Sequence, residues 1–364
     1  MASGAAAQPT TGGASYGQEV APFGMLHIGQ RWETEGFSAE TSFIIRSGWA
    51  VSTLRQYKTY YKKWLLFCKR EKVGETEVSL GQLLQFFTEL FNNGASFSSV
   101  NTAKAALLMF VTVDGHTDWN NNVFVIKFFK GVYNLRPPLP RYGRTWDVNM
   151  LVNYLQTLDP ASSLTLKKLS MKCVALVAIV SGARAQSIHL MNIDLMHMTE
   201  NRLTFYFDTP LKTSKAGRPA QVIEINRYTA NPACCVYAAL TEYMNRTREL
   251  RKDSNLWISH RKPHEAVGRS SISRWIKDCL GLAGIDISTF SAHSTRMAST
   301  SKANNAGVGL QAILKTAGWS SPSNFLKFYM KDTAPDQHRR DFAEAVLATP
   351  STEGLSSSGG ASFC

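Results

Sequence analysis

The chain has 364 residues, enough for two ordinary domains that each bury a hydrophobic core. Lysine and arginine number 40 against 27 aspartates and glutamates, a formal charge of +13, which favours a polyanion such as nucleic acid as partner. No apolar run reaches the roughly 18 residues of a membrane span, no signal-peptide pattern opens the chain, and six scattered cysteines argue against a disulfide framework. We therefore expect a soluble intracellular protein.

The two ends of the chain have the composition of disordered tails. Residues 1–38 are rich in Ala, Gly, Ser and Thr and carry no charge before Glu19, and residues 349–364 are rich in Ser and Gly. Such segments contain too little apolar surface to fold. We expect folded structure in residues 39–135 and 146–348, joined by a linker at 136–145.

The first predicted helix starts at Ser52 or Thr53, either of which could cap it. Apolar side chains follow at helical spacing: Leu54, Tyr57, Tyr61, Trp64, Leu65 and Cys68. Four cations share a different face: Arg55, Lys58, Lys62 and Lys69. That face could be an ordinary solvated surface, or it could contact DNA phosphates.

Three more helical segments are predicted at Leu80–Phe91, at 98–112 and at 119–134, which gives a small all-α domain. A proline-rich stretch then forbids helix and favours an extended linker. Its three arginines could lie along a phosphate backbone: Arg136, Arg141 and Arg144.

The second half is predicted to be mostly helical with one small β-hairpin. An apolar helix covers 167–181 and stops at Gly182, and further helices start near Pro232, Ser270, Ser291, Gly309 and Pro322. Strands are predicted at 203–207 and 221–225. The polar loop between them carries cations that could reach a polyanion: Lys212, Lys215 and Arg218.

A zinc site was considered at Cys234 and Cys235 with His260 and His264. Adjacent cysteines cannot easily both reach one tetrahedral ion, and the usual two-residue gap between them is absent. We therefore expect no metal site.

Five residues whose side chains could act on a phosphodiester lie in the second half of the chain: Arg184, His293, Arg296, Trp319 and Tyr329. Arginine forks suit phosphate oxygens, His and Trp can add donors, and a phenol can act as a nucleophile where cations stabilise phenolate. Each residue alone could instead be a helix cap, an ion-paired arginine or a core aromatic. Together they indicate metal-free cleavage of a phosphodiester.

The motifs that hold these residues resemble those of the tyrosine recombinases (integrase, Cre and Xer types). They are Ser181-Gly-Ala-Arg184, His293-Ser-Thr-Arg296, Gly318-Trp319 and Phe328-Tyr329. The resemblance covers about residues 45–345 and implies a SAM-like α-helical core-binding domain followed by a mostly helical catalytic domain. It also implies a DNA strand transferase without cofactor, acting on double-stranded DNA as a tetramer. Sequence style is most similar to the recombinases of DIRS/Ngaro-type retrotransposons, which implies a nuclear location.

The resemblance also implies a role for each residue. Arg184 and Arg296 clamp the scissile phosphate, His293 and Trp319 add donors, and Tyr329 forms a 3′-phosphotyrosyl link. Lys212, with Lys215 as the rival, protonates the leaving 5′-oxygen. Two departures are Ser187, where bacterial members usually have an acid, and a Trp319-to-Tyr329 spacing one residue longer than is common.

Three other functions remain open from the sequence. The chain could be a DNA-binding protein that has lost catalysis, a type IB topoisomerase, or an all-α scaffold protein with incidental basic charge.

Overall fold

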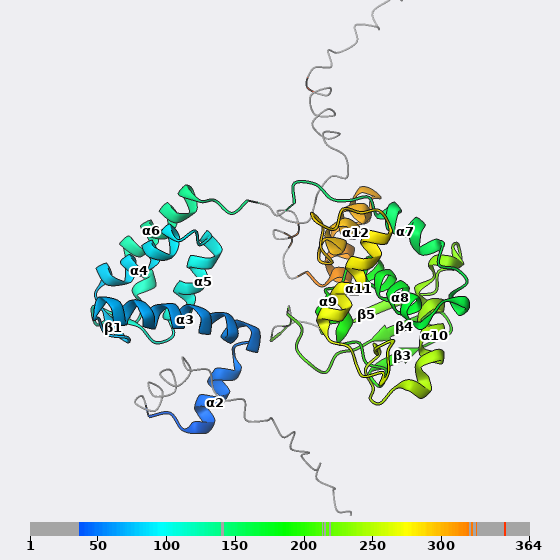
Figure 1. Cartoon of the computed structure of the whole chain (residues 1–364), viewed down its shortest axis with the longest axis horizontal. Helices are drawn as coiled ribbons and strands as arrows, with labels where there is room; N and C mark the ends of the chain where they lie inside the picture. The colour runs from blue at the N-terminus through cyan, green and yellow to red at the C-terminus, as the bar shows by residue number, and fades with distance from the viewer. Residues whose placement is uncertain are drawn as a thin grey trace, which may run out of the picture. The chain divides into compact units, whose positions relative to one another are not determined.

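The computed structural model describes residues 36–139, 142–212, 214, 216–217, 220–319, 322, 325 and 346. The chain divides into two compact units between residues 139 and 140 (Figure 1). The predicted tails lie outside the described residues, apart from residues 36–38, and so does the helix predicted from Pro322, apart from isolated positions. Four candidate site residues also lie outside the described residues: Arg141, Lys215, Arg218 and Tyr329.

The N-terminal unit is a helical assembly with one very small parallel sheet. Its elements are α2 (Ala39–Ser47), α3 (Val51–Glu71), β1 (Glu77–Val78), α4 (Leu80–Asn92), α5 (Phe97–Leu107), β2 (Thr112–Val113), the 3₁₀ turn η1 (Trp119–Asn121) and α6 (Val123–Leu135). Long helix α3 packs on α5. Aromatic rings fill the space between α3 and α4, where Trp64 meets Phe86 edge-on at a centroid distance of 5.0 Å.

The apolar stripe predicted on α3 is confirmed, since Tyr61, Trp64 and Cys68 are buried. The predicted start was wrong by one or two residues: α3 begins at Val51, and its N-cap Ala50 makes no side-chain capping bond. Ser52 and Thr53 therefore lie inside the first turn, where they can no longer cap the helix.

Two other predicted helices are shorter than expected. The 98–112 helix ends at Leu107, because the chain then turns to place Val111 and β2 in the core. The 119–134 helix is interrupted at Asn122, whose side chain accepts the amide of Phe124 at 2.8 Å and caps α6. A strong side-chain cap inside an apolar stretch divides it into two elements.

The C-terminal unit surrounds the buried helix α8 (Leu166–Ser181) (Figure 1). The remaining elements are α7 (Val148–Gln156), η2 (Ala161–Ser163), α9 (Ala185–His189), β3 (Met196–Met198), β4 (Arg202–Phe205), β5 (Ile223–Asn226), η3 (Pro232–Cys234), α10 (Val236–Thr247), η4 (Arg248–Leu250), α11 (Arg269–Leu282), α12 (Ser294–Asn305) and α13 (Leu310–Ala317). Helices α10, α11 and α12 all pack on α8. Because α8 is apolar on nearly all sides, it can be buried in this way.

The three strands form an antiparallel sheet in the order β3-β4-β5, with Leu203 opposite Ile225. The predicted hairpin is confirmed as β4 and β5. Sequence reasoning missed β3, which is three residues long and largely exposed, so it carries little hydrophobic pattern. Among the described helices, none is both long and apolar enough to cross a membrane.

Candidate active site

The first candidate arginine lies just beyond the end of α8. Gly182 ends this helix in the left-handed conformation, with φ of 56°. The Ser181 hydroxyl donates to the carbonyl of Val177 at 2.6 Å and accepts the amide of Ala183 at 3.1 Å, which fixes the turn. Arg184 follows in extended conformation as the N-cap residue of α9, and it is half-buried. The helix stop read from the sequence therefore places this arginine at the edge of the core.

The second candidate arginine, Arg296 on α12, is only 1% exposed. Its Nη1 donates to the carbonyl of Gly182 at 2.5 Å and to the carbonyl of Ala317. These are the last backbone carbonyls at the ends of α8 and α13, where helix dipoles concentrate negative partial charge. One guanidinium thus holds two helix ends together.

Trp319 lies close to both arginines. Gly318 ends α13 with φ of 63°, and the Trp319 amide donates back to the carbonyl of Leu314 at 2.8 Å. The guanidinium carbon of Arg296 is 4.0 Å from the centroid of the indole ring, and that of Arg184 is 5.8 Å from it. Both distances are within the range of cation–π attraction. The structure therefore brings together three residues that are far apart in sequence.

Close backbone contact explains the glycine at position 182. A Cβ there would lie 3.1 Å from the Cβ of Ala317 and 3.5 Å from Cγ2 of Thr300. Thr300 on α12 and Ala317 on α13 thus pack closely against the end of α8 at Gly182.

His293 is the N-cap residue of α12 and is exposed. The prediction that a helix starting at Ser291 would contain it was wrong, since α12 begins at Ser294. The preceding segment forms a turn in which the Ser294 amide donates to the carbonyl of Ser291 at 2.8 Å. Trp146 Nε1 donates to the Ser294 hydroxyl at 2.9 Å and anchors this turn to the core. His293 still lies one helical turn before Arg296.

A carboxylate stabilises the approach to this turn. Asp286 Oδ1 accepts the hydroxyl of Ser288 at 2.6 Å, the amide of Ser288 at 2.9 Å and the amide of Thr289 at 3.4 Å. These hydrogen bonds, the Ser288 hydroxyl first, lower the pKa of Asp286 to about 2. Sequence reasoning missed Asp286, although an Asp two residues before a Ser is a familiar turn signal.

Lys212 lies on the connection between β4 and β5. The Ser214 amide donates to the carbonyl of Leu211 at 2.9 Å, and the Leu211 amide donates to the Ser214 hydroxyl at the same distance. Leu211 is buried and anchors this turn, while Lys212 is exposed. The turn therefore presents the lysine to solvent.

The candidate DNA-binding cations differ in their surroundings. On α3, Lys58 is half-buried, whereas Arg55, Lys62 and Lys69 are exposed, and Arg144 is exposed in the C-terminal unit. Arg136 has a structural contact that sequence reasoning missed. Its Nη1 donates to the carbonyls of Phe91 at 2.9 Å and Ala95 at 2.6 Å, and its guanidinium carbon lies 4.1 Å from the centroid of the Phe91 ring.

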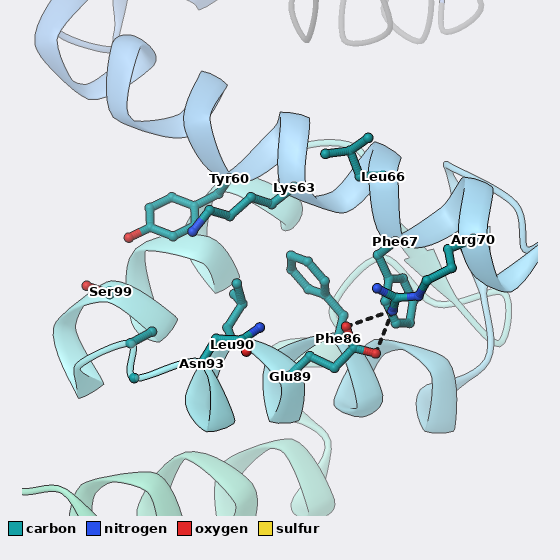
Figure 2. Close-up of a pocket in the computed structure, with 12 residues that line it drawn as sticks. Tyr60, Lys63, Leu66, Phe67, Arg70, Phe86, Glu89, Leu90, Asn93 and Ser99 are labelled. Atoms are coloured by element: carbon teal, nitrogen blue, oxygen red, sulfur yellow. Dashed lines mark hydrogen bonds and ion pairs between the residues drawn. The ribbon is translucent and has the colours of Figure 1, made fainter.

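A groove of about 420 Å³ lies beside α3, with its floor formed by aromatic and aliphatic side chains of α3 and α4 (Figure 2). Two further cations line it, Lys63 and Arg70. Arg70 donates to the carboxylate of Glu89 at 2.6 and 2.7 Å, as the dashed lines in Figure 2 show. The ion pair joins α3 to α4 at one end of the groove, so Arg70 belongs to the fold of this unit.

The cysteines and histidines considered for zinc have other contacts. The sulfur of Cys235 accepts the amide of Tyr228 at 3.3 Å, and Nδ1 of His264 is hydrogen-bonded to the carbonyl of Ser259 at 2.9 Å. Within the described ranges, no three His, Cys, Asp or Glu side chains are grouped so that they could hold a metal ion.

Residues 146–335 match the family model described as the phage integrase family, which is more than half of the chain. The protein therefore belongs to the phage integrase family. No curated protein sequence matches it.

Solved structures with a similar fold are themselves recombinases and integrases. XerH site-specific recombinase bound to difH substrate has a TM-score of 0.53 and 15% identity, over 81% of this chain and 77% of that chain. The Tn1549 transposon integrase in complex with transposon right end DNA has a TM-score of 0.53 and 13% identity, over 90% and 99%. A lambda integrase dimer bound to a COC′ core site has a TM-score of 0.50 and 13% identity, over 86% and 78%. The predicted fold class, mainly helical with small sheets, is confirmed.

Proposed function

We propose that the protein is a site-specific DNA recombinase of a mobile element that cuts and rejoins DNA through a 3′-phosphotyrosyl intermediate. The observation that carries this proposal is the convergence of Arg184 and Arg296 on the Trp319 ring. A phosphodiester bound at this ring could accept hydrogen bonds from both guanidinium groups. Membership of the phage integrase family supports the same reaction class.

The arginines would act on the non-bridging phosphate oxygens. Negative charge grows on these oxygens as phosphorus becomes five-coordinate, and fixed guanidinium donors stabilise it without reorganising. Arg296 is suited to this because its position is fixed by the carbonyls of Gly182 and Ala317. His293, at the exposed start of α12, and the Trp319 N–H would add donors.

Tyr329 would supply the nucleophile. Its phenol must lose its proton, and because a phenol has a pKa of about 10, nearby cations are needed to favour phenolate. The bond from the phenolic oxygen to phosphorus forms while the bond from phosphorus to the 5′-oxygen breaks. The exposed Lys212 would donate the proton to that 5′-oxygen, with Lys215 as the alternative. Attack by the 5′-hydroxyl of a partner strand would then reverse the step, with no metal or cofactor required.

The biological setting is a finer part of the same proposal. The motif resemblance favours an element of the DIRS/Ngaro type, and with it a nuclear location. Exchange between two duplexes requires two cuts on each, so we propose that four copies assemble on two DNA sites. One of the solved structures with a similar fold is a lambda integrase dimer bound to a COC′ core site.

A covalent-adduct assay tests the proposal. The probe is a nicked duplex that carries the sequence the protein enriches from a random DNA pool, and the reaction contains EDTA. Wild type should form a protein–DNA adduct, Tyr329→Phe should not, and the exposed-tyrosine control Tyr228→Phe should react like wild type.

Each other outcome has a distinct meaning. DNA binding without an adduct would overturn the proposal in favour of a non-catalytic DNA-binding protein. In a separate assay on a supercoiled plasmid, relaxation without exchange between two duplexes would indicate a topoisomerase. An adduct that persists in Tyr329→Phe would contradict the assignment of the nucleophile.

A further inference from the structure

A second group of cations lies around a hairpin that none of the assignments above uses. Residues Ile258 and Ala266 form an antiparallel bridge, and the Ser259 amide donates to the carbonyl of Glu265 at 2.8 Å. At the tip, the His264 amide donates to the carbonyl of Arg261 at 2.9 Å, which closes a four-residue turn. The hydrogen bond between Nδ1 of His264 and the carbonyl of Ser259 also fixes the tip. The hairpin is therefore an ordered structure that presents its side chains at defined positions.

Side chains from three elements bring positive charge to this tip. Arg261 lies on the hairpin, Lys167 near the start of α8 and Arg274 on α11, and all three are exposed. Helices α8 and α11 pack together, and they meet where the thiol of Cys279 donates to the carbonyl of Met171 at 3.5 Å. The packing of these two helices thus gathers cations that are about 100 residues apart in sequence.

The pKa of His260, on the same hairpin, responds to the electrostatic potential of these cations. Its ring lies 6.2 Å from the ring of Trp275, and burial lowers its pKa. The charges of Arg261, Lys167, Arg274 and His264 lower that pKa further. The local potential is therefore positive.

The nearest acidic side chain of the hairpin is already neutralised, because Glu265 accepts from Lys252 Nζ at 2.5 Å. Within the described ranges, Lys167, Arg261 and Arg274 form no ion pair. An exposed basic face can simply be solvated, but here three cations without acidic partners meet at one fixed turn. Such a surface fits a polyanion.

We propose that this surface, formed by Lys167, Arg261 and Arg274, binds DNA phosphates separately from the candidate active site. The inference rests on the proposed function and extends the DNA contact beyond the scissile phosphate. Cations that contact phosphates position a duplex without reading its sequence. The surface would therefore hold flanking DNA whatever its sequence.

The length of α8 separates the two sites. Lys167 lies near its start and Arg184 just after its end, so at 1.5 Å per residue they are about 25 Å apart along the helix axis. On a straight duplex, about 25 Å corresponds to about seven base pairs. One phosphate cannot occupy both sites, so the surface adds contacts that the active-site residues cannot make.

The test is the salt dependence of DNA binding by the full-length protein. The double variant Arg261→Gln/Arg274→Gln is compared with Arg202→Gln/Arg248→Gln, which removes the same charge from exposed positions elsewhere in the C-terminal unit. Fluorescence anisotropy would follow binding to a labelled 30-base-pair duplex of the enriched sequence between about 50 and 200 mM salt. Two lost phosphate contacts should reduce the slope of log K against log salt by about 1.8, whereas the control should keep the wild-type slope.

Equal slopes for the two double variants would overturn the inference, whether both match wild type or both fall. Circular dichroism confirms that each variant is folded. Adduct formation by wild type, measured at saturating protein, tests the proposed function independently of the salt slopes. If wild type forms no adduct but the slopes differ, the proposed function fails and the surface stands. If the adduct forms and the slopes agree, only the surface is refuted.

Discussion

Replacing Gly182 with alanine should destabilise the C-terminal unit more than the same change at Gly307. Both glycines have positive φ, 56° and 81°. An L-residue in the left-handed region costs about 1–2 kcal/mol, and both variants incur this cost. The difference between the two losses in unfolding free energy therefore excludes the backbone cost and measures the effect of packing around the added Cβ.

Packing around the two glycines differs sharply. A Cβ at position 182 would lie 3.1 Å from the Cβ of Ala317, while at position 307 no atom lies within 4 Å. Because the neighbouring atoms belong to packed helices, overpacking should add about 1–2 kcal/mol. We expect a total loss of about 2–4 kcal/mol for Gly182→Ala and about 1–2 kcal/mol for Gly307→Ala.

Urea denaturation followed by tryptophan fluorescence measures both losses. Since both residues lie in the same unit, the same transition reports them. Gly182→Ala should also slow adduct formation, because the Gly182 carbonyl accepts from Arg296, whereas Gly307→Ala should react normally. Equal destabilisation by the two changes would refute the reasoning that three helices meet at Gly182.

Other variants test single contacts. Arg136→Met removes two hydrogen bonds, to the carbonyl of Phe91 in the last turn of α4 and to that of Ala95 just beyond it, and should cost about 1–3 kcal/mol in urea denaturation. An unchanged midpoint would count against a structural role. Asp286→Asn should reduce acid sensitivity: the folded pKa of Asp286 is lowered to about 2, below its unfolded value of about 4. Its stabilisation is present above pH of about 4 and lost as pH falls through about 2. Melting temperatures from pH 5 to 2 that fall equally in wild type and variant would contradict this. Arg296→Lys keeps the charge but lacks the planar guanidinium that places Nη1 against the Gly182 and Ala317 carbonyls, so it should lose both stability and adduct formation. A variant with wild-type stability would show that the guanidinium geometry matters little.

The sequence predicted the structure best at helix ends marked by a glycine. Gly182 and Gly318 each follow an apolar helical pattern, and both end their helices in the left-handed conformation, as expected of a C-terminal glycine. Those stops place Arg184 and Trp319 directly after helix ends. Their meeting with Arg296 followed from the chemistry of the residues and from the family resemblance, which local patterns alone could not provide.

Contacts between distant segments could not be read from the sequence. Arg136 was interpreted as a DNA-binding residue, but its acceptors lie 41 and 45 residues earlier in the chain. Arg296 was interpreted as a phosphate clamp, and nothing local shows that it also joins the ends of α8 and α13. Helix starts were uncertain for a different reason. The helix predicted from residue 98 begins at Phe97, because Ser96 accepts the Ser99 amide at 3.2 Å and caps α5.

In the proposed reaction, the arginine–tryptophan site delivers a DNA phosphate to Tyr329. The most direct test is to trap the adduct on nicked DNA, digest the DNA and protein, and identify the modified peptide by mass spectrometry. Wild type should yield a peptide with a nucleotide linked to Tyr329, and Arg296→Lys should yield no such peptide. A nucleotide on any other residue, or a modified Tyr329 at wild-type yield in the Arg296 variant, would contradict the proposed reaction.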